Sequence, residues 1–245
     1  MNIVHVGAHQ DDEARALGTL IKYRREGGHN ITFICTTNGD KGFTFDTETP
    51  YEVVAAARDR EMRAVAGALG ADYICLGEPD EYLFDSKAVR LKLIDALRAC
   101  KADLIFTDWI DEYNADHTIT AQLVLQCAML TMIASIKTEH PALAATPKIF
   151  HCDPGAGFAG AALGFEGTHF VELSEAIVDE KVRVINLHES QMAIMRQFGG
   201  DWAEEHRRHC RMVGARVGVP YAEVFRPCLA PRRTPLANML PLGDH

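Results

Sequence analysis

The sequence predicts a doubly wound α/β fold, that is, a mostly parallel sheet with helices on both faces. Short runs rich in β-branched and aromatic residues alternate along the chain with longer stretches of helical periodicity. This alternation is typical of parallel strands joined by helical crossovers. The chain has 245 residues, of which 47% are hydrophobic, and this is enough to bury one sizeable core. We therefore expect a single domain over residues 1–245.

The elements are predicted in a regular order. An apolar strand at Asn2–Gly7 leads directly into a helix over 13–26, which ends at Gly27 and Gly28 because glycine is favoured at helix ends. Further strands are predicted at 31–36, 73–76, 103–107 and 148–151, with a strand-like run at 167–173. Further helices are predicted at 53–69, 86–101, 117–137, 174–197 and 201–217. The proline-rich stretch over 220–245 is expected to be an irregular tail.

Composition limits the kinds of partner. The chain has 25 Lys and Arg against 34 Asp and Glu, a net charge of -9, which disfavours nucleic acid and anionic membranes because both would be repelled. No apolar stretch reaches the roughly 18 to 20 residues needed to cross a membrane, and the N-terminus lacks the pattern of a signal peptide. The seven cysteines include no CxxC pair and are expected to be free thiols in a reducing compartment. These features predict a cytoplasmic protein that acts on a small molecule. They are also compatible with a homo-oligomer.

The most informative segment is residues 9–13, His-Gln-Asp-Asp-Glu, between the first strand and the first helix. One imidazole and three carboxylates at the end of a strand can hold a divalent cation and leave a group free to accept a proton from water. The simpler alternative is a polar helix start, because acidic residues are favoured in a first turn.

A second polar cluster, residues 108–117, follows the fourth predicted strand. In a doubly wound sheet of order 3-2-1-4-5, the first and fourth strands are neighbours, and a crevice opens at their carboxyl ends. The two clusters are far apart in sequence but would face each other across this crevice. This placement favours a ligand site over a simple helix start.

Within these clusters, His9, Asp12 and His117 can reach one metal and leave a position open for water, as in catalytic rather than structural zinc sites. Two imidazoles and one carboxylate favour zinc, with Fe(II), Co(II) and Mn(II) as alternatives. Asp11 is then free to act as general base, although it could also be a supporting partner of a ligand or a solvated side chain. Asp116 is expected to cap the following helix and orient its neighbour rather than to bind the metal.

Several short motifs in residues 1–195 together resemble the PIG-L/LmbE family of zinc-dependent N-deacetylases and occur in that family's order. The motifs are His-x-Asp-Asp-Glu at 9–13, residues 37–42 after the second strand, Arg58-x-x-Glu61, residues 76–80 after the third strand, Asp116-His117, and residues 188–191.

The resemblance implies a Rossmann-like fold and hydrolysis of an N-acyl group, usually N-acetyl, from an amino sugar or a related amine. By matching motifs, His9, Asp12 and His117 fall on the metal ligands and Asp11 on the general base. In the implied mechanism, Asp11 takes a proton from the attacking water, the resulting hydroxide attacks the acyl carbon, and the metal stabilises the oxyanion.

Two further residues, Arg58 and Asp80, fall near positions at which the family binds substrate, and two others depart from its pattern. Gln10 stands where the family has proline, which changes the stiffness of the turn more than the chemistry. Asn114 stands where the family has the first histidine of His-Pro-Asp-His. Asparagine can still donate a hydrogen bond to an oxyanion, but it cannot protonate a leaving amine.

Another acid is then needed, unless Asp11 returns the proton that it removes. The candidates are His151, His169 and His188, each of which is more simply explained as a structural histidine. We rank His169 first as a catalytic residue, because the glycine-rich segment over 155–160 could bring it over the metal as a mobile loop. Trp202 and the nearby group over 204–206 could line a substrate entrance or contact another subunit, but an ordinary amphipathic helix explains them more simply.

The sequence thus predicts a metal-dependent hydrolase that removes an N-acyl group, in the first place N-acetyl, from a small amino sugar, a glycoside conjugate or a related amine. Hydrolysis of a non-sugar amide is the alternative, and the substitution at Asn114 is compatible with it. A ligand-binding domain with a degraded site is a third hypothesis, but the ligands and the base are all present. An NAD-dependent oxidoreductase is disfavoured, because the first strand-helix turn carries acids in place of the GxGxxG glycines.

Overall fold

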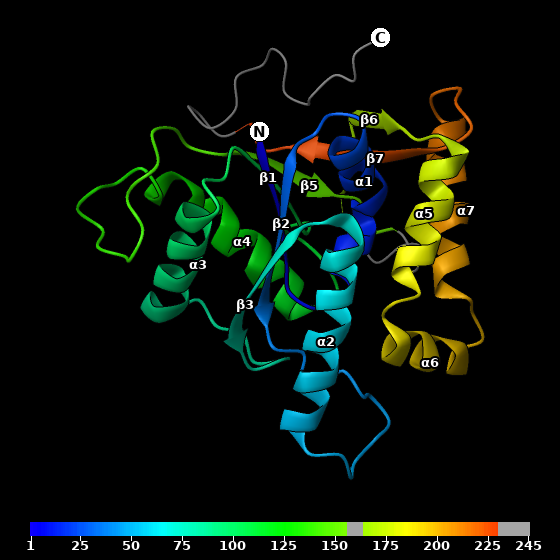
Figure 1. The fold of residues 1–245 in the computed structure, drawn as a ribbon, viewed down its shortest axis with the longest axis horizontal. Coiled ribbons are helices and arrows are strands. Elements are labelled where there is room, and N and C mark those ends of the chain that lie inside the picture. The colour runs from blue at the N-terminus through cyan, green and yellow to red at the C-terminus, as the bar shows by residue number, and fades with distance from the viewer. Residues whose placement is uncertain (156–163, 230–245) are drawn as a thin grey trace.

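The computed structural model describes residues 1–155 and 164–229, which form a seven-stranded sheet with helices on both faces (Figure 1). The strands are β1 (Asn2–Gly7), β2 (Asn30–Thr37), β3 (Asp72–Glu78), β4 (Leu104–Thr107), β5 (Lys148–Cys152), β6 (His169–Glu172) and β7 (Ala222–Pro227). The helices are the 3-10 turn η1 (Asp12–Arg15), α1 (Leu17–Arg25), α2 (Tyr51–Leu69), α3 (Lys87–Ala99), α4 (Ala115–Leu130), α5 (Glu175–Ile185), α6 (Glu189–Gln197) and α7 (Trp202–Ala215).

The sheet has the order β3-β2-β1-β4-β5-β7-β6. Its first five strands pair in parallel, and β7 is antiparallel to both β5 and β6. The predicted fold class and the predicted strand order 3-2-1-4-5 are therefore confirmed. The antiparallel pair extends the sheet beyond β5, on the side where α5 and α7 lie (Figure 1).

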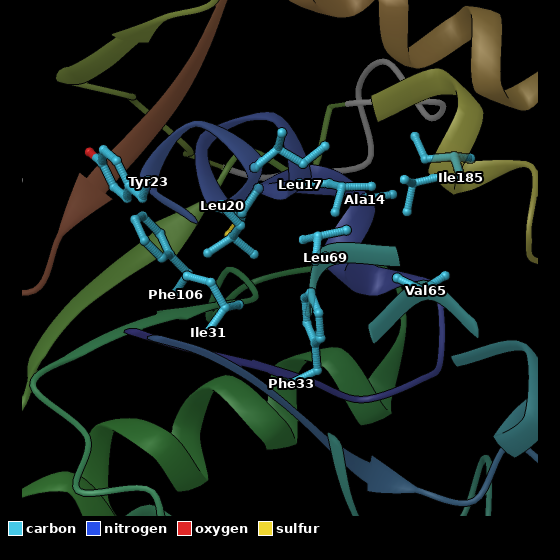
Figure 2. Close-up of a cluster of buried hydrophobic side chains, with 14 of the residues drawn as sticks. Ala14, Leu17, Leu20, Tyr23, Ile31, Phe33, Val65, Leu69, Phe106 and Ile185 are labelled. Carbon is cyan, nitrogen blue, oxygen red and sulfur yellow. The ribbon is translucent and has the colours of Figure 1, made fainter. Parts of the chain in front are cut away.

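Alternation along the strands divides the core into two layers, because successive side chains point to opposite faces of a sheet. Phe33 of β2 and Phe106 of β4 belong to a cluster with α1, α2, α5 and α7, to which Leu20 and Leu69 contribute (Figure 2). The residue before Phe106 in β4, Ile105, belongs to the cluster on the opposite face, with α3 and α4. Because helices cover both faces of the sheet, a ligand site is expected at the ends of the strands.

The predicted helices differ from the observed ones where side chains bind the backbone. The helix predicted over 117–137 ends at Leu130, because the buried Arg98 of α3 donates to the carbonyl oxygens of Thr131, Ile133 and Ile136. These bonds satisfy the carbonyl groups beyond the helix end.

Two other predicted helices are each divided in two. The helix expected over 13–26 begins as the separate 3-10 turn η1 before α1. The helix expected over 174–197 is divided into α5 and α6 at His188, whose Nε2 lies 2.8 Å from Glu13 Oε1 in the interior.

The expectation of an irregular tail from residue 220 is wrong for β7. This strand lies between β5 and β6, and Val224 and Phe225 are buried within it. Its Glu223 side chain accepts hydrogen bonds from the backbone N–H groups of Gly18 and Thr19 at 2.9 and 2.7 Å. A short apolar run between two prolines is a weak strand signal, but it supplies the missing partner of β5.

Part of the predicted organisation lies outside the described residues. Residues 156–163, which include most of the glycine-rich segment, and residues 230–245 of the predicted tail are not among them. Within the ranges that are described, no helix is long and apolar enough to cross a membrane.

Candidate active site

Two loops meet at the carboxyl ends of β1 and β4, as expected at the switch point of a doubly wound sheet. The strands pair with Val6 opposite Thr107, and the Thr107 hydroxyl donates to the Val6 carbonyl oxygen at 2.8 Å. The two following loops therefore emerge side by side. They bring His9 and Asp12 from the first loop to His117 in the first turn of α4.

The three predicted metal ligands converge on one point. His9 Nδ1 lies 3.1 Å from His117 Nε2, and His117 Nε2 lies 3.2 Å from Asp12 Oδ1. The third separation, from His9 Nδ1 to Asp12 Oδ2, is 3.7 Å. In a tetrahedral zinc site with bonds of about 2.0 to 2.1 Å, neighbouring ligand atoms are about 3.3 Å apart. The observed separations fit such a site.

The turn that presents Asp12 depends on a close backbone approach. Asp12 Oδ2 accepts a hydrogen bond from the backbone N–H of His9 at 2.8 Å, which folds the carboxylate back over the end of β1. A Cβ atom added at Gly7 would lie 2.7 Å from Asp12 Cβ, closer than real side chains come. Glycine at this position therefore makes room for the ligand.

His117 is held by a second set of charged side chains that the sequence analysis did not identify. Its Nδ1 donates to Glu112 Oε2, which leaves Nε2 directed at Asp12 and His9. Arg15 donates to both oxygens of the same carboxylate and to Asp108 Oδ1 at 2.9 Å. An outer carboxylate of this kind fixes the tautomer and orientation of a ligand histidine.

His9 is supported from the loop after β3. Its Nε2 lies 2.9 Å from Asp80 Oδ1 and 3.5 Å from Asp116 Oδ2, although neither pair is aligned as a hydrogen bond. Asp116 also accepts hydrogen bonds from the backbone N–H groups of Glu81 and Leu83 at 2.7 and 3.2 Å. Both carboxylates favour a His9 ring that presents Nδ1 to the metal position.

The cap of α4 is Asn114, not Asp116 as the sequence analysis expected. Asn114 Oδ1 accepts from the backbone N–H groups of Asp116 and His117 at 2.8 and 3.3 Å. Its amide nitrogen is directed at Glu81 Oε1 at 3.4 Å. The oxygen of Asn114 is thus used by the helix, and only its N–H₂ group is available to a substrate.

The pKa values in this cluster reflect burial opposed by close charges. Burial lowers the pKa of His117, but the Asp12 and Glu112 carboxylates together outweigh it and raise that pKa to about 9. Burial would raise the pKa of Asp12, but His117 and His9 hold it well below its usual range. Against burial, Asp116 and Asp80 raise the pKa of His9 well above its ordinary value. A metal and these protons compete for the same ring nitrogens, so metal binding should strengthen as pH rises.

Asp11, the predicted base, is paired with Arg58, one of the two predicted substrate-binding residues. Arg58 Nη2 lies 3.2 Å from Asp11 Oδ1, and the arginine side chain is buried. Among the described residues, Arg58 Nε and Nη1 have no hydrogen-bond partner. Asp11 is therefore held beside the cluster by a cation rather than solvated.

The cluster opens into a cavity of about 200 Å³. Asp11, Arg58, Asp80 and Asn114 line it together with the ligands. Gln191 and Met195 of α6 and Trp202 and His206 of α7 contribute a further wall of the lining. The sequence analysis explained the segment around Trp202 more simply as an amphipathic helix. The structure places Trp202 and His206 in the lining of this cavity.

The structure does not bring His169, the first-ranked candidate acid, to this cavity. His169 begins β6, which is the edge strand beyond β7. Its ring centroid lies 5.5 Å from that of Phe150, and its Nδ1 lies 2.9 Å from Thr168 Oγ1. The ring is packed against the sheet and is absent from the cavity lining among described residues.

The other two candidate acids have structural contacts. His151 Nδ1 lies 2.7 Å from the carbonyl oxygen of Asp108, and the His188 ring contacts Glu13. Neither is among the described residues that line the cavity.

Comparison with known proteins decides the family. The model of the PIG-L family, GlcNAc-PI de-N-acetylase, matches residues 4–128, which are 125 of the 245 residues. The chain belongs to the PIG-L family. The matched range contains all the predicted ligands and the predicted base.

Individual relatives of this PIG-L chain have different activities. Diacetylchitobiose deacetylase of Thermococcus kodakarensis is 26% identical over 200 residues, which are 77% of this chain and 69% of that protein. The structure of N,N'-diacetylchitobiose deacetylase from Pyrococcus horikoshii has a TM-score of 0.77 at 23% identity, covering 97% of this chain and 88% of the other. GalB of Pseudomonas putida, a 4-carboxy-2-hydroxymuconate hydratase, has a TM-score of 0.80 at 20% identity, covering 96% and 99%. Because one fold carries both chemistries, the reaction must be argued from the site.

Proposed function

We propose that this protein is a metal-dependent hydrolase that removes an N-acyl group, in the first place N-acetyl, from an amino sugar, a glycoside conjugate or a related small amine. The observation that carries the proposal is the convergence of His9 Nδ1, His117 Nε2 and an Asp12 oxygen at the base of a cavity that Asp11 also lines. Family membership and the diacetylchitobiose deacetylase relative support N-acetyl amino sugars as the substrate class.

The donor set fits a divalent transition metal. Two imidazoles and one carboxylate in a site that opens to a cavity favour zinc, with Fe(II), Co(II) and Mn(II) as alternatives. When bound there, such an ion acts as a Lewis acid that activates water and polarises the acyl carbonyl group. The supporting contacts of Glu112 and Asp80 hold the two imidazoles with the required nitrogens facing inward.

Asp11 is the proposed general base. Its carboxylate lines the cavity beside the ligands, and Arg58 fixes its orientation from the buried side. With His169 away from the cavity, Asp11 also returns the proton to the leaving amine, so that one carboxylate serves both steps.

Asn114 and Arg58 are the proposed donors to the substrate. The Asn114 amide N–H₂ can donate to the oxyanion that forms on the acyl carbon, because its oxygen is already bound to the helix. Arg58 has two buried nitrogens without acceptors among the described residues, which suits a substrate oxygen. Asp80 lines the cavity but is placed chiefly to orient His9.

The test is an amine-release screen of the metal-analysed protein. Wild type and Asp11→Asn, each loaded with zinc, are incubated with N,N'-diacetylchitobiose, N-acetylglucosamine and N-cyclohexylacetamide, and primary amine is measured. We expect release from the sugars, and a loss on the order of 10²-fold or more in kcat for Asp11→Asn at unchanged metal content. Release only from N-cyclohexylacetamide would favour the non-sugar alternative. Full activity of Asp11→Asn would remove it as base, and no release from any substrate would overturn the proposed reaction.

A further inference from the structure

One buried histidine in the cavity wall has no hydrogen-bond partner for either ring nitrogen among the described residues. His206 lies on α7, is 1% exposed and lines the cavity. Neither its Nδ1 nor its Nε2 has a hydrogen-bond partner among residues 1–155 and 164–229. Buried polar atoms are nearly always paired in proteins, and an unpaired one destabilises the fold.

Other buried histidines show the ordinary arrangement. His188 contacts Glu13 in the interior at 2.8 Å, and His151 contacts a backbone carbonyl oxygen at 2.7 Å. His209, one turn after His206 on the same helix, has its Nε2 3.1 Å from Asp153 Oδ2. Single buried nitrogens without a partner also occur in His5, His9 and His188, but among the described residues His206 alone has both ring nitrogens in this state.

The surroundings of His206 determine its hydrogen-bonding character. Burial lowers its pKa well below the ordinary value, and the positive charges of Lys181, His209 and Arg15 act in the same direction. A neutral imidazole has one N–H donor and one nitrogen acceptor. A hydroxyl group has the same pair of capacities and is the simplest complement.

Trp202 gives the same wall an apolar surface. It lies one turn before His206 on α7, lines the cavity, and packs edge to face with the imidazole at 4.9 Å between ring centroids. A rigid aromatic surface next to a donor and an acceptor suits a ring that has apolar C–H faces and hydroxyl edges. An acetyl group offers only an acceptor oxygen, whereas a hydroxylated ring matches the donor, the acceptor and the aromatic surface together, so we place the amine half of the substrate against this wall.

We propose that His206 and Trp202 form a subsite for a hydroxylated ring in the amine half of the substrate, with His206 hydrogen-bonded to a ring hydroxyl. This subsite rests on the proposed function only in assigning the ring to the leaving amine. In this subsite His206 is a substrate-binding residue.

The experiment compares two amines that differ in ring hydroxyls. Glucosamine and cyclohexylamine both carry a primary amine on a six-membered ring, and each amine is compared between variants, so that its own contact with the metal cancels. Dissociation constants are measured by NMR titration of zinc-loaded wild type, His206→Phe, His206→Gln and His209→Gln. Because neither probe turns over, the measurement does not depend on deacetylase activity.

The expected result is a loss confined to the hydroxylated amine. One neutral hydrogen bond corresponds to an affinity ratio of about 2- to 13-fold, so His206→Phe should weaken glucosamine by such a factor and leave cyclohexylamine unchanged. His206→Gln keeps a donor and an acceptor and should recover part of the loss. The unfolding temperature of His206→Phe should equal or exceed that of wild type, because the buried unpaired atoms are removed.

The control and the contrary outcomes separate the alternatives. His209→Gln should lower the unfolding temperature by loss of its contact with Asp153 and leave both affinities unchanged. Unchanged glucosamine affinity in His206→Phe and His206→Gln, or equal loss for both amines, overturns the subsite. If hydroxyl-dependent binding is found but no N-acetyl sugar releases amine, the subsite stands and the proposed reaction fails.

Discussion

Replacing Glu112 with glutamine tests whether the contacts behind a ligand histidine control metal binding. The Glu112 side chain is fully buried and accepts from His117 Nδ1 and from both terminal nitrogens of Arg15. Its charge makes the imidazole a stronger ligand, and its position directs Nε2 toward the metal. Glutamine keeps the length and one acceptor oxygen but removes the charge.

The expected effect is on metal affinity more than on folding. Loss of an outer partner of a ligand lowers metal affinity by about 10- to 100-fold. Because glutamine can still accept the His117 proton, we expect the lower end, about tenfold, which corresponds to about 1.4 kcal/mol. Arg15 keeps its 2.9 Å contact with Asp108, so this buried cation retains a partner and the protein should remain folded.

Zinc dissociation constants are measured by competition with a chromophoric chelator for wild type, Glu112→Gln and Asp111→Asn. Asp111 is the neighbouring residue, is exposed, and loses the same charge in its variant. We expect Asp111→Asn to bind zinc as wild type does. Equal zinc affinity of folded Glu112→Gln and wild type would refute the role of Glu112, and an equal loss in both variants would indicate a general effect of charge.

Two further predictions concern stability and the acyl oxygen. Burial lowers the pKa of His5 to about 4 from the 6.5 expected in the unfolded chain, so the unfolded state takes up a proton that the folded state does not, and stability falls between these values as pH decreases. Between pH 7 and pH 5 this group should lower the free energy of unfolding, measured with urea, by about 2 kcal/mol. In His5→Phe the decrease over the same pH range should be smaller by that amount. Equal pH dependence of the unfolding free energy in the two proteins would contradict this. Asn114→Asp keeps an oxygen to cap α4 and should unfold near the wild-type temperature, but loss of the amide donor should lower kcat/KM by about 10²-fold. Asn114→Ala should also lose about 1 kcal/mol of stability with the cap, and an unaltered kcat/KM in Asn114→Asp would exclude the amide from the mechanism.

The position of the site followed from the sequence because it depends on local pattern and topology. Apolar runs located the parallel strands, and the order 3-2-1-4-5 placed the loops of β1 and β4 together. His9 and Asp12 are three residues apart in one turn, and His117 begins the helix after the neighbouring strand. These positions relative to the strands do not change when the predicted end of an element is wrong by a few residues. The proximity of the three side chains could therefore be predicted.

What could not be predicted depends on distant contacts with little local signal. Glu112 and Arg15 look like ordinary loop and helix charges until the fold places them behind His117. The end of α4 is set by Arg98 from another helix. The position of His169 depended on β7, whose short apolar run was hidden between prolines, and β7 places β6 at the sheet edge.

The charges around the cavity explain why so acidic a cluster can be stable and why it favours a cation. Arg15 pairs with Asp108 and Glu112, and Arg58 pairs with Asp11. These two cations come from η1 and α2, so the same elements that build the fold offset part of the buried negative charge. The Asp12 carboxylate differs, because its close side-chain contacts are the imidazoles of His9 and His117, which are charged only when protonated. Once those rings give up their protons, a buried carboxylate remains that needs a compensating positive charge. A divalent ion at this point satisfies the carboxylate and both neutral imidazoles together, which the fixed arginines around it are not placed to do.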